Sequence, residues 1–254
     1  MQPTYLLMTD QFPIYDQLVY EEGFLRTRDE TLIWINRGSP PAIVLGISSA
    51  ADAMIDPLRL ALNPIPMIRR YSGGGTVVVD HQTLFVTLIA NAEEQKIAPY
   101  PQAIMQWSEQ FYRSTLHNLP FALKENDYVI GEKKFGGNAQ YLTKKRFTHH
   151  STLLWDYSKE LMGLLKHPKK TPDYRLNRSH DDFLTCLSLY FQQQEEFLNP
   201  FQQTLMQFFD CQWIDIHQLK MMIDRPFRQS THILESISCS RSDLLSSSDQ
   251  KMLV

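Results

Sequence analysis

One stretch decides how the rest of the sequence is interpreted, Arg69-Arg70-Tyr71-Ser72-Gly73-Gly74-Gly75-Thr76-Val77-Val78-Val79-Asp80. Two arginines and a serine run into three consecutive glycines, which lack the Cβ atoms that keep backbone N–H groups away from a ligand. An arginine donates paired hydrogen bonds to a phosphate or carboxylate, and successive loop N–H groups form a concave patch of partial positive charge. The pattern favours an anion-binding loop; the alternative is a glycine-rich turn beside two surface arginines.

Strands are expected on both sides of this loop. A short helix predicted over residues 51–63 ends at Asn63-Pro64-Ile65-Pro66, whose prolines deliver the chain in an extended conformation into Arg69. The β-branched residues 77–79 predict a buried strand, which we expect to pair with the β-branched run 83–90 across a short turn. This pairing places the glycine loop at one end of a sheet.

Two longer helices and a further hairpin are predicted. Residues 15–25 have the apolar spacing of a packing helix, with the paired glutamates 21–22 on its other side. Residues 101–119 have the spacing of an amphipathic helix. Two strand-like runs, 31–36 and 42–46, are separated by turn residues that include two prolines, so they predict a β-hairpin.

The composition bounds the class of protein. With 254 residues, 43% of them hydrophobic and 21% charged, the chain can form a globular domain with a sizeable core. A net charge of −3 and a pI near 6.2 give no overall positive field for nucleic acid or an anionic membrane surface. No apolar run is long enough to span a membrane, and the N-terminus lacks the apolar core of a signal peptide. We therefore expect a cytoplasmic protein.

The cysteines point to the same compartment. Cys186, Cys211 and Cys239 are odd in number and far apart, and the sequence has no C-x-x-C motif. Neither a disulfide framework nor a structural zinc site is therefore expected.

A second charged segment covers residues 124–140. A short strand ends in a glycine-containing turn, and the return strand begins with Lys133 and Lys134 and continues into two glycines. Because neighbours on a strand face opposite sides, only one of these lysines can face a ligand. Asp127 on the partner strand is a candidate for holding hydrated Mg²⁺ together with phosphate oxygens. Taken alone, the segment is equally compatible with a solvated charged hairpin.

Known phosphate-binding motifs of other folds are missing. The sequence contains no G-K-[ST] of a P-loop and no G-x-G-x-x-G after a strand. A P-loop or Rossmann fold is therefore not indicated.

Four motifs in this order resemble those of the lipoate-protein ligase A family. They are residues 69–77 followed by Asp80; Asn126-Asp127; Lys134-x-x-Gly137-x-Ala139-Gln140; and His149-His150-Ser151-Thr152-Leu153-Leu154. The family shares its catalytic fold with octanoyltransferases and, more distantly, with biotin-protein ligases. The resemblance spans residues 5–215 and implies an α+β domain with a mixed, mostly antiparallel sheet flanked by helices. We assign residues 1–235 to this domain and expect the serine-rich residues 236–254 to form a flexible tail.

The resemblance also implies a reaction in two steps. Lipoate and ATP give lipoyl-AMP and pyrophosphate, and the acyl group then passes to the ε-amine of a lysine on a lipoyl domain. ATP, Mg²⁺ and lipoate are the implied ligands. The implied acceptors are lipoyl-domain proteins such as 2-oxoacid dehydrogenase E2 or the glycine cleavage H protein. Long ligases carry a C-terminal accessory domain associated with adenylation, and few residues follow the helix expected at 197–209. A partner subunit for adenylation, or the use of preformed lipoyl-AMP, is therefore a further expectation.

Each matching residue receives an implied role. Lys134 is the expected catalytic residue, which polarises the acyl carbonyl; Asn126 and Asp127 position the nucleotide and Mg²⁺, with Asp127 as the metal ligand. The residues expected to bind lipoate or the adenylate are Arg70, Ser72, Gly73, Gly74, Gly75, Val77, Gly137, Ala139, His150 and Thr152.

An apolar tunnel is required for the lipoyl chain, and the strand residues Val77, Val79 and Phe135 are expected to line it. Of the adjacent His149 and His150, one should face the pocket and the other the core.

The sequence departs from the family pattern at two places. Val79-Asp80 stands where the family has His-Asp, so the role of that histidine is either lost or taken over by His81 from another direction. Ile47-Ser48-Ser49 follows Gly46, where the family often has Arg and Gln, which changes how the acyl end of the pocket is closed.

A downstream basic region also bears on the site. A basic stretch at 166–170 precedes Arg175 and Arg178, which come just before a helix expected to be capped by Ser179 or Asp181. In related ligases a comparable arginine-containing segment lies near the adenylate. The alternative is an exposed basic loop, and a basic rim would also steer an acidic lipoyl domain.

Three functions are compatible with the sequence. The first is an ATP-dependent lipoyl ligase, or a lipoyltransferase supplied with lipoyl-AMP. The second is an octanoyltransferase that uses octanoyl-acyl carrier protein and a cysteine nucleophile, although no cysteine lies between residues 69 and 154 and Cys186 is expected in the core. The third is a non-catalytic binder of lipoyl domains; the presence of Lys134, Asp127 and the arginine pair argues against it.

Overall fold

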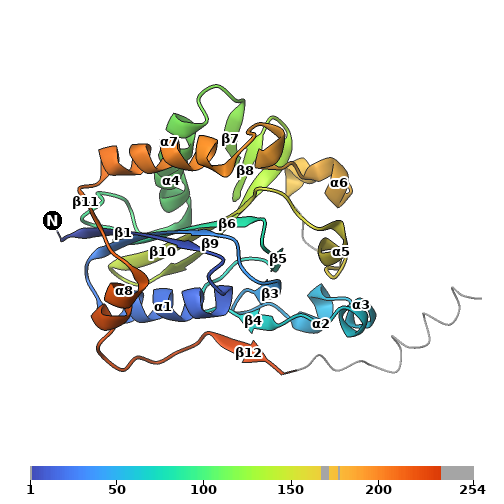
Figure 1. Cartoon of the computed structure of the whole chain (residues 1–254), viewed down its shortest axis with the longest axis horizontal. Coiled ribbons are helices and arrows are strands. Elements are labelled where there is room, and N and C mark those ends of the chain that lie inside the picture. Colours follow the sequence, from blue (N-terminus) through green and yellow to red (C-terminus); the bar gives the residue numbers. More distant parts are fainter. Residues whose placement is uncertain (1, 167–171, 177, 236–254) are drawn as a thin grey trace, which may run out of the picture.

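Two β-sheets form the framework of the protein (Figure 1). In this computed structural model residues 2–166, 172–176 and 178–235 are described, so the serine-rich segment 236–254 lies outside the described residues. The large sheet has the strand order β11 (Cys211–Trp213), β1 (Thr4–Asp10), β2 (Thr31–Arg37), β6 (Thr83–Asn91), β10 (Arg146–Leu154), β9 (Lys133–Leu142), β8 (Asp127–Ile130) and β7 (Phe121–Lys124). The small sheet has the order β12 (His232–Leu234), β4 (Met67–Arg69), β3 (Ala42–Leu45) and β5 (Val77–Val79).

Strand directions are mixed but mostly antiparallel. In the two sheets together, the parallel pairs among the described strands are β1–β2, β1–β11 and β3–β4. The expected α+β class with a mixed, mostly antiparallel sheet is therefore confirmed. The extended approach to Arg69 is also confirmed, because β4 ends at that residue.

Helices cover both faces of the large sheet (Figure 1). One face carries α4 (Pro101–Thr115) and α7 (Gln194–Phe208), and the other carries α1 (Ile14–Thr27), α8 (Ile216–Met222) and the small sheet. Short elements complete the fold: α2 (Ala51–Met54), α3 (Pro57–Leu62), α5 (Lys159–Met162), α6 (His180–Phe183) and the 3₁₀ turns η1 (Asp173–Arg175) and η2 (Leu187–Leu189). In the described part of the chain, no helix is long and apolar enough to cross a bilayer.

Each face of the large sheet buries its own apolar cluster. Beneath α4 and α7 the cluster is aromatic and includes Phe111, Tyr112 and Phe201. Between α1 and the sheets, Phe24 and Trp34 are fully buried. The predicted helices at 15–25 and 101–119 are therefore confirmed as packing helices, since each buries one apolar side against the sheet.

The predicted hairpin of residues 31–36 and 42–46 is wrong. β2 pairs with β1 and β6 in the large sheet, whereas β3 pairs with β4 and β5 in the small one. Gly38 has φ +89°, a conformation that L side chains rarely adopt, and the prolines that follow cannot donate a ladder hydrogen bond. The chain therefore leaves the large sheet after Arg37 instead of folding back along it.

The predicted pairing of residues 77–79 with residues 83–90 is also wrong, because the two strands belong to different sheets. β5 pairs antiparallel with β3, while β6 lies in the large sheet between β2 and β10. The carboxylate of Asp80 accepts the N–H of Gln82 at 2.9 Å, and the N–H of Asp80 donates to the hydroxyl of Thr83 at 3.0 Å. This turn sends the chain from one sheet to the other, so the glycine loop lies at the junction of two sheets.

The helix predicted over 51–63 is divided in two. Asp56 accepts the N–H groups of Leu58 and Arg59, and Pro57 occupies the first position of α3. An aspartate cap followed by proline starts a new helix, which ends α2 before it.

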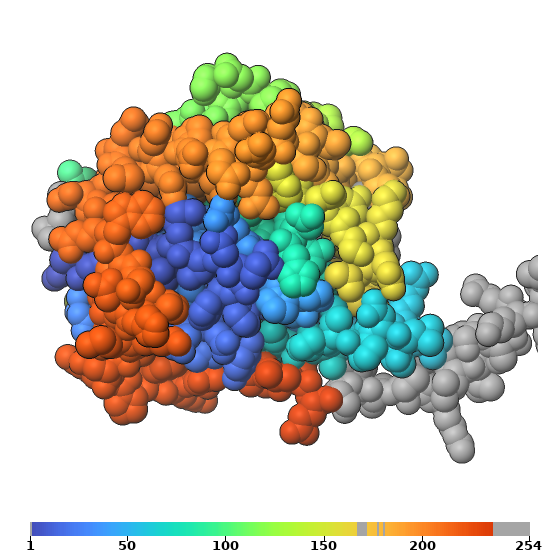
Figure 2. Space-filling model, in the orientation of Figure 1, coloured from blue at the N-terminus to red at the C-terminus, as the bar shows by residue number. Residues whose placement is uncertain are grey.

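The C-terminal part of the described chain runs back across α1 (Figure 2). After α8 it adds β12 to the free edge of β4, with His232 opposite Arg69. Glu22 on α1 anchors this crossing: its carboxylate is fully buried and accepts the N–H groups of Ser230 and Thr231 at 2.9–3.0 Å. The placement of the paired glutamates 21–22 away from the packed side of the helix is therefore wrong, because both carboxylates are buried.

We predict that Glu22→Ala lowers the free energy of unfolding by about 2–4 kcal/mol, because it leaves two backbone N–H groups without an acceptor. Urea denaturation followed by circular dichroism measures the change. Asp16→Ala, at an exposed position of the same helix, should cost less than about 1 kcal/mol. Equal losses in the two variants would contradict the anchoring role of Glu22.

Candidate functional site

The glycine loop rests on strand β9. The N–H of Gly73 donates to the carbonyl of Gln140 at 3.0 Å, which joins the loop to the large sheet. Gly74 has φ +102°, and a Cβ there would lie 2.8 Å from Nη2 of Arg70 and 3.2 Å from the Cβ of Ala139. The carbonyl of Ser72 accepts the N–H of Ile47 at 2.9 Å. Both the tight conformation and the close packing require residues without side chains at this point.

Arg70 holds the loop from inside. Its side chain is buried, and Nη2 donates to the carbonyls of Gly73 and Gly75, both at 2.8 Å. Within the described residues no carboxylate forms an ion pair with it. Burial lowers the pKa of Arg70 to about 10, so the group remains charged at neutral pH. A buried cation with only neutral partners favours an anionic ligand beside it.

The neighbouring side chains refine this picture. The side chain of Arg69 donates to the carbonyls of Gly46, Ile47 and Ser49. It therefore holds the backbone of the segment 47–49, which departs from the family pattern. Ser72 is buried, and its hydroxyl has no hydrogen-bond partner among the described residues. The alternative of a turn beside two surface arginines does not hold for Arg70.

A narrow cavity opens where α1 and the two sheets meet. Its volume is about 30 Å³, which is space for about two water molecules. The acyl chain expected from the sequence would fit only if the cavity widens. The cavity is lined mainly by apolar side chains, interrupted by polar ones: Ile14, Gln17, Leu18, Val44, Arg70, Val77, Val79, Phe85, Thr87, Ala139, His150, Ser151 and Thr152.

The tunnel residues expected from the sequence divide into two groups. Val77 and Val79 line the cavity as expected. The placement of Phe135 there is wrong, because its ring is fully buried on the opposite face of the sheet, stacked on Tyr128. The register between β8 and β9 shifts beside Tyr128, so Phe135 is the extra residue of a bulge.

Lys134 and Asp127 meet across the β8–β9 hairpin. Nζ of Lys134 lies 2.8 Å from Oδ1 of Asp127, whereas the neighbouring Lys133 is exposed. The alternation of strand side chains thus separates the two lysines as expected. Nζ also lies beside Gly137, where an added Cβ would approach it to 3.2 Å. Lys134 therefore reaches along the same strand, β9, on which the glycine loop rests.

The other oxygen of Asp127 is also engaged. Oδ2 accepts the hydroxyl of Tyr174, which belongs to η1, at 2.9 Å. Burial, followed by the charge of Asp127, raises the pKa of the Tyr174 hydroxyl well above its ordinary value. Asn126 is exposed, and its carbonyl accepts the side-chain amide of Asn138 at 3.0 Å. The turn that carries Asp127 is thus fixed from both sides.

The two downstream arginines pack against this hairpin. Arg175 is buried, and its Nε donates to the carbonyl of Arg178 at 3.1 Å. Arg178 in turn donates to the carbonyl of Glu132 at 3.0 Å. The alternative of an exposed basic loop is therefore wrong for Arg175. Ser179 caps α6 as predicted, since it accepts the N–H of Asp182. Most of the basic stretch, residues 167–170, lies outside the described residues.

The adjacent histidines face opposite sides of β10, as expected. His149 is fully buried on the α4 side, where Nε2 lies 3.2 Å from the hydroxyl of Tyr128 and Nδ1 lies 3.1 Å from Nε2 of Gln140. Burial lowers the pKa of His149 to about 3. His150 lines the cavity, and its Nδ1 lies 3.0 Å from a carboxylate oxygen of Glu21.

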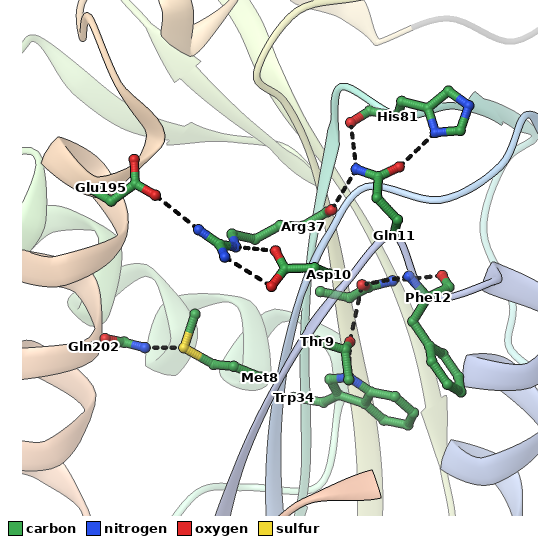
Figure 3. Close-up of polar contacts among 11 residues, drawn as sticks. Met8, Thr9, Asp10, Gln11, Phe12, Trp34, Arg37, His81, Glu195 and Gln202 are labelled. Atoms are coloured by element: carbon green, nitrogen blue, oxygen red, sulfur yellow. Dashed lines mark hydrogen bonds and ion pairs between the residues drawn. The ribbon is translucent and has the colours of Figure 1, made fainter.

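His81 is not among the residues that line the cavity. It is exposed and contacts the side chain of Gln11, which also donates to the carbonyls of Arg37 and His81 (Figure 3). Val79 occupies the cavity wall instead. The histidine of the family pattern is therefore not replaced by His81.

Two further participants were not found from the sequence. Glu21 reaches the cavity wall from a helix face that the pattern assigns to solvent, and its contacts there, Thr87 and His150, lie far away in the sequence. Tyr174 contacts Asp127 across 47 positions. No local signal in the sequence identifies either contact.

The fold and site define a class of protein. A glycine loop held by a buried arginine rests on β9. The same strand carries Lys134, which pairs with Asp127 of β8, and Ala139, which lines the cavity. Such a site suits an apolar acid joined to an anionic group.

Comparison with known proteins identifies the family. The family model of the lipoyl protein ligase A/B catalytic domain matches residues 13–210. The chain belongs to this family.

Individual relatives agree with this assignment. The inactive lipoate–protein ligase 2 of Plasmodium falciparum is 27% identical over 91% of this chain and 70% of that protein. Matches to other curated lipoate–protein ligases span between 36% and 46% of those relatives' length.

Solved structures show the same fold. A bi-partite lipoate protein ligase from Thermoplasma acidophilum, studied with its E2 lipoyl domain, superposes with a TM-score of 0.69 at 19% identity. The match covers 88% of this chain and 91% of that one. A lipoate-protein ligase A bound with ATP gives a TM-score of 0.70 at 19% identity and covers 88% and 92% of the two chains.

We predict that acid destabilises the protein through His149. The unfolded chain binds a proton near the ordinary histidine pKa of 6.5, but in the folded protein burial lowers the pKa to about 3. Between these values the unfolded state holds the extra proton, so the free energy of unfolding falls as the pH falls, by up to about 1.4 kcal/mol per pH unit.

Urea unfolding at pH 7, 6 and 5 tests this dependence. His149→Gln should be less stable at pH 7 but should show a smaller decrease toward pH 5. His81→Gln, which changes an exposed histidine and leaves the buried one in place, should keep the wild-type decrease. An unchanged pH dependence in His149→Gln contradicts the prediction.

Proposed function

We propose that this protein transfers a lipoyl group, through lipoyl-AMP made from lipoate and ATP, to the ε-amine of a lysine on a lipoyl domain. The observation that carries the proposal is the Lys134–Asp127 pair, because Lys134 lies on β9, the strand that supports the glycine loop and contributes Ala139 to the cavity wall. Membership of the lipoyl protein ligase A/B catalytic domain family supports the same reaction.

Different residues of the site bind different parts of the substrate. The apolar wall that includes Val77, Ala139 and Thr152 holds the acyl chain. The backbone N–H groups of Ser72, Gly74 and Gly75, in a loop fixed by Arg70, present partial positive charge to the carboxylate and the phosphoryl group. Gly137 leaves room for the acyl head beside Nζ of Lys134. Because these donors are fixed before the reaction, they stabilise developing charge without reorganising.

Two bond exchanges make up the reaction. In the first, a carboxylate oxygen of lipoate bonds to the α-phosphorus of ATP, and pyrophosphate leaves with the electrons of the broken P–O bond. In the second, the acceptor amine attacks the acyl carbon, the bond to AMP breaks, and the amine loses a proton. In the second exchange, Lys134 donates a hydrogen bond to the acyl carbonyl and so makes its carbon more electrophilic.

Mg²⁺ and ATP fit the β8–β9 hairpin if one carboxylate oxygen of Asp127 is released from its present partner. Both carboxylate oxygens of Asp127 are engaged, one by Lys134 and one by Tyr174. Within the described residues no cluster of three or more metal-ligating side chains is present. One oxygen freed from Tyr174, together with nucleotide phosphate oxygens, matches the way Mg²⁺ is commonly bound. The ion would neutralise phosphate charge, and Asn126 beside Asp127 would contact the nucleotide.

Lipoyl-AMP could be made by this chain itself or supplied to it. The bi-partite ligase of Thermoplasma acidophilum resembles this chain over 91% of its own length. By analogy, a separate subunit for adenylation, or the use of preformed lipoyl-AMP, is the second candidate function. The acceptors proposed for either function are lipoyl-domain proteins, namely 2-oxoacid dehydrogenase E2 or the glycine cleavage H protein.

The cysteines argue against an octanoyltransferase. Burial raises the pKa of Cys186 to about 12 and that of Cys211 to about 11. Neither residue lines the cavity, and Cys239 lies outside the described residues. A thioester route requires a thiolate near the lysine, which these two thiols do not supply.

We predict that Lys134→Ala lowers transfer at least about 100-fold, because it removes a donor to the acyl carbonyl. An apo lipoyl domain is incubated with lipoate plus Mg-ATP, with lipoyl-AMP, or with octanoyl carrier protein, and its mass is measured. The wild-type protein should add a lipoyl group with lipoyl-AMP, and with lipoate plus Mg-ATP if it adenylates by itself.

Lys133→Ala is the matched control, since this neighbouring lysine is exposed, and it should transfer at the wild-type rate. Undiminished transfer by Lys134→Ala, or modification from the carrier protein alone, would overturn the proposal. Cys186→Ala should also leave transfer intact; a loss of transfer in that variant favours the thioester route.

A further inference from the structure

Glu21 places a fully buried carboxylate behind the cavity wall, beside three residues that line it, Gln17, Thr87 and His150. One oxygen accepts the side-chain amide of Gln17 at 2.8 Å and the hydroxyl of Thr87 at 2.6 Å. The other lies 3.0 Å from Nδ1 of His150. Gln17 in turn accepts the amide of Asn36 at 2.9 Å. Helix α1 and strands β2, β6 and β10 thus meet in a buried polar cluster, although the rest of the cavity wall is mainly apolar.

His150 lies beside this carboxylate. Among the described residues, its ring holds the only basic nitrogen within ion-pair distance of Glu21. The Glu21 oxygen on this side and Nε2 of His150 are both buried and have no hydrogen-bond partner in the described part of the chain. His150 therefore presents an unpaired polar nitrogen at the wall of the cavity.

The register of strand β9 gives the position of the His150 ring along the cavity. Nζ of Lys134 lies beside Gly137, and Ala139 follows two residues later on the same face, opposite His150 on β10. Two residues of a strand span roughly 7 Å. An acyl group with its carbonyl at Lys134 therefore brings the outer half of an eight-carbon chain to His150. In a lipoyl group that half carries the disulfide ring, and in an octanoyl group it carries methylenes.

Resting on the proposed function, we propose that the Glu21–His150 pair makes the cavity select the disulfide ring of a lipoyl group over a saturated octanoyl chain. A ring sulfur is polarisable and packs favourably against an aromatic ring, and it accepts a weak hydrogen bond from a ring N–H. A methylene chain fills the same space and leaves the buried nitrogen unpaired, which disfavours it. His150 contacts the ligand, and Glu21, 3.0 Å from Nδ1, is a positioning residue for the ring.

A competition experiment tests this selectivity. The full-length protein is incubated with equal concentrations of lipoyl-AMP and octanoyl-AMP and a limiting amount of apo lipoyl domain, and the two products are quantified by mass spectrometry. Wild type should favour the lipoyl product about 10-fold or more, in the range by which unpaired buried polar groups discriminate. Glu21→Gln and His150→Phe should bring the ratio close to one.

Glu22→Gln is the matched control. This carboxylate is equally buried on the same helix but contacts the C-terminal segment, so its loss should leave the product ratio unchanged. The ratio does not depend on how much of a variant is folded, because unfolded protein transfers neither group. The product ratio therefore distinguishes a change in selectivity from a loss of folded protein.

Two results would overturn the inference in different ways. A wild-type protein that transfers both groups without preference, or variants that keep the wild-type ratio, would remove the role of Glu21 and His150 but leave the proposed function standing. A wild-type protein that transfers neither group removes the proposed function, and the selectivity with it.

Discussion

The buried guanidinium group of Arg70 is the interaction on which the site depends. It sits at the junction of the two sheets and ties the carbonyls of Gly73 and Gly75 to one point, while Gly73 itself is bonded to β9. The loop therefore keeps its shape without a ligand. Because the positive charge is matched by no carboxylate in the described residues, its burial is most favourable when an anion lies beside it. One side chain thus both builds the loop and selects what the loop binds.

Helix α1 gives the second constraint, through two consecutive carboxylates with different tasks. Glu21 points to the cavity wall and Glu22 to the C-terminal segment, which carries β12 back to the edge of β4. Since β4 leads directly into the glycine loop, the anchoring of the C-terminal segment also supports the strand that presents Arg70. The cavity is narrow because these packed elements meet around it. Acyl binding and the packing of α1 against the two sheets are therefore coupled.

The features that the sequence predicts are local. Three glycines define the loop, strand alternation separates Lys133 from Lys134, and a turn with Gly131 closes the hairpin. The errors concern partners distant in the chain. β3 and β5 look like hairpin strands, but the sheet to which each belongs is decided by non-local pairing. Glu21 and Glu22 resemble a solvated face because their partners lie 66 and more than 200 positions away. Phe135 was misplaced because a bulge changes which face it occupies.

The central claim is that the glycine loop and Lys134 bind one mixed anhydride between them. The most direct test is a crystal structure of the protein with a non-hydrolysable sulfamate analogue of lipoyl-AMP. We expect the acyl chain between α1 and the two sheets, the sulfamate within hydrogen-bond distance of the N–H groups of Ser72, Gly74 or Gly75, and Nζ of Lys134 at the acyl carbonyl. An analogue bound elsewhere, or bound with the loop and Lys134 both out of contact, would contradict it.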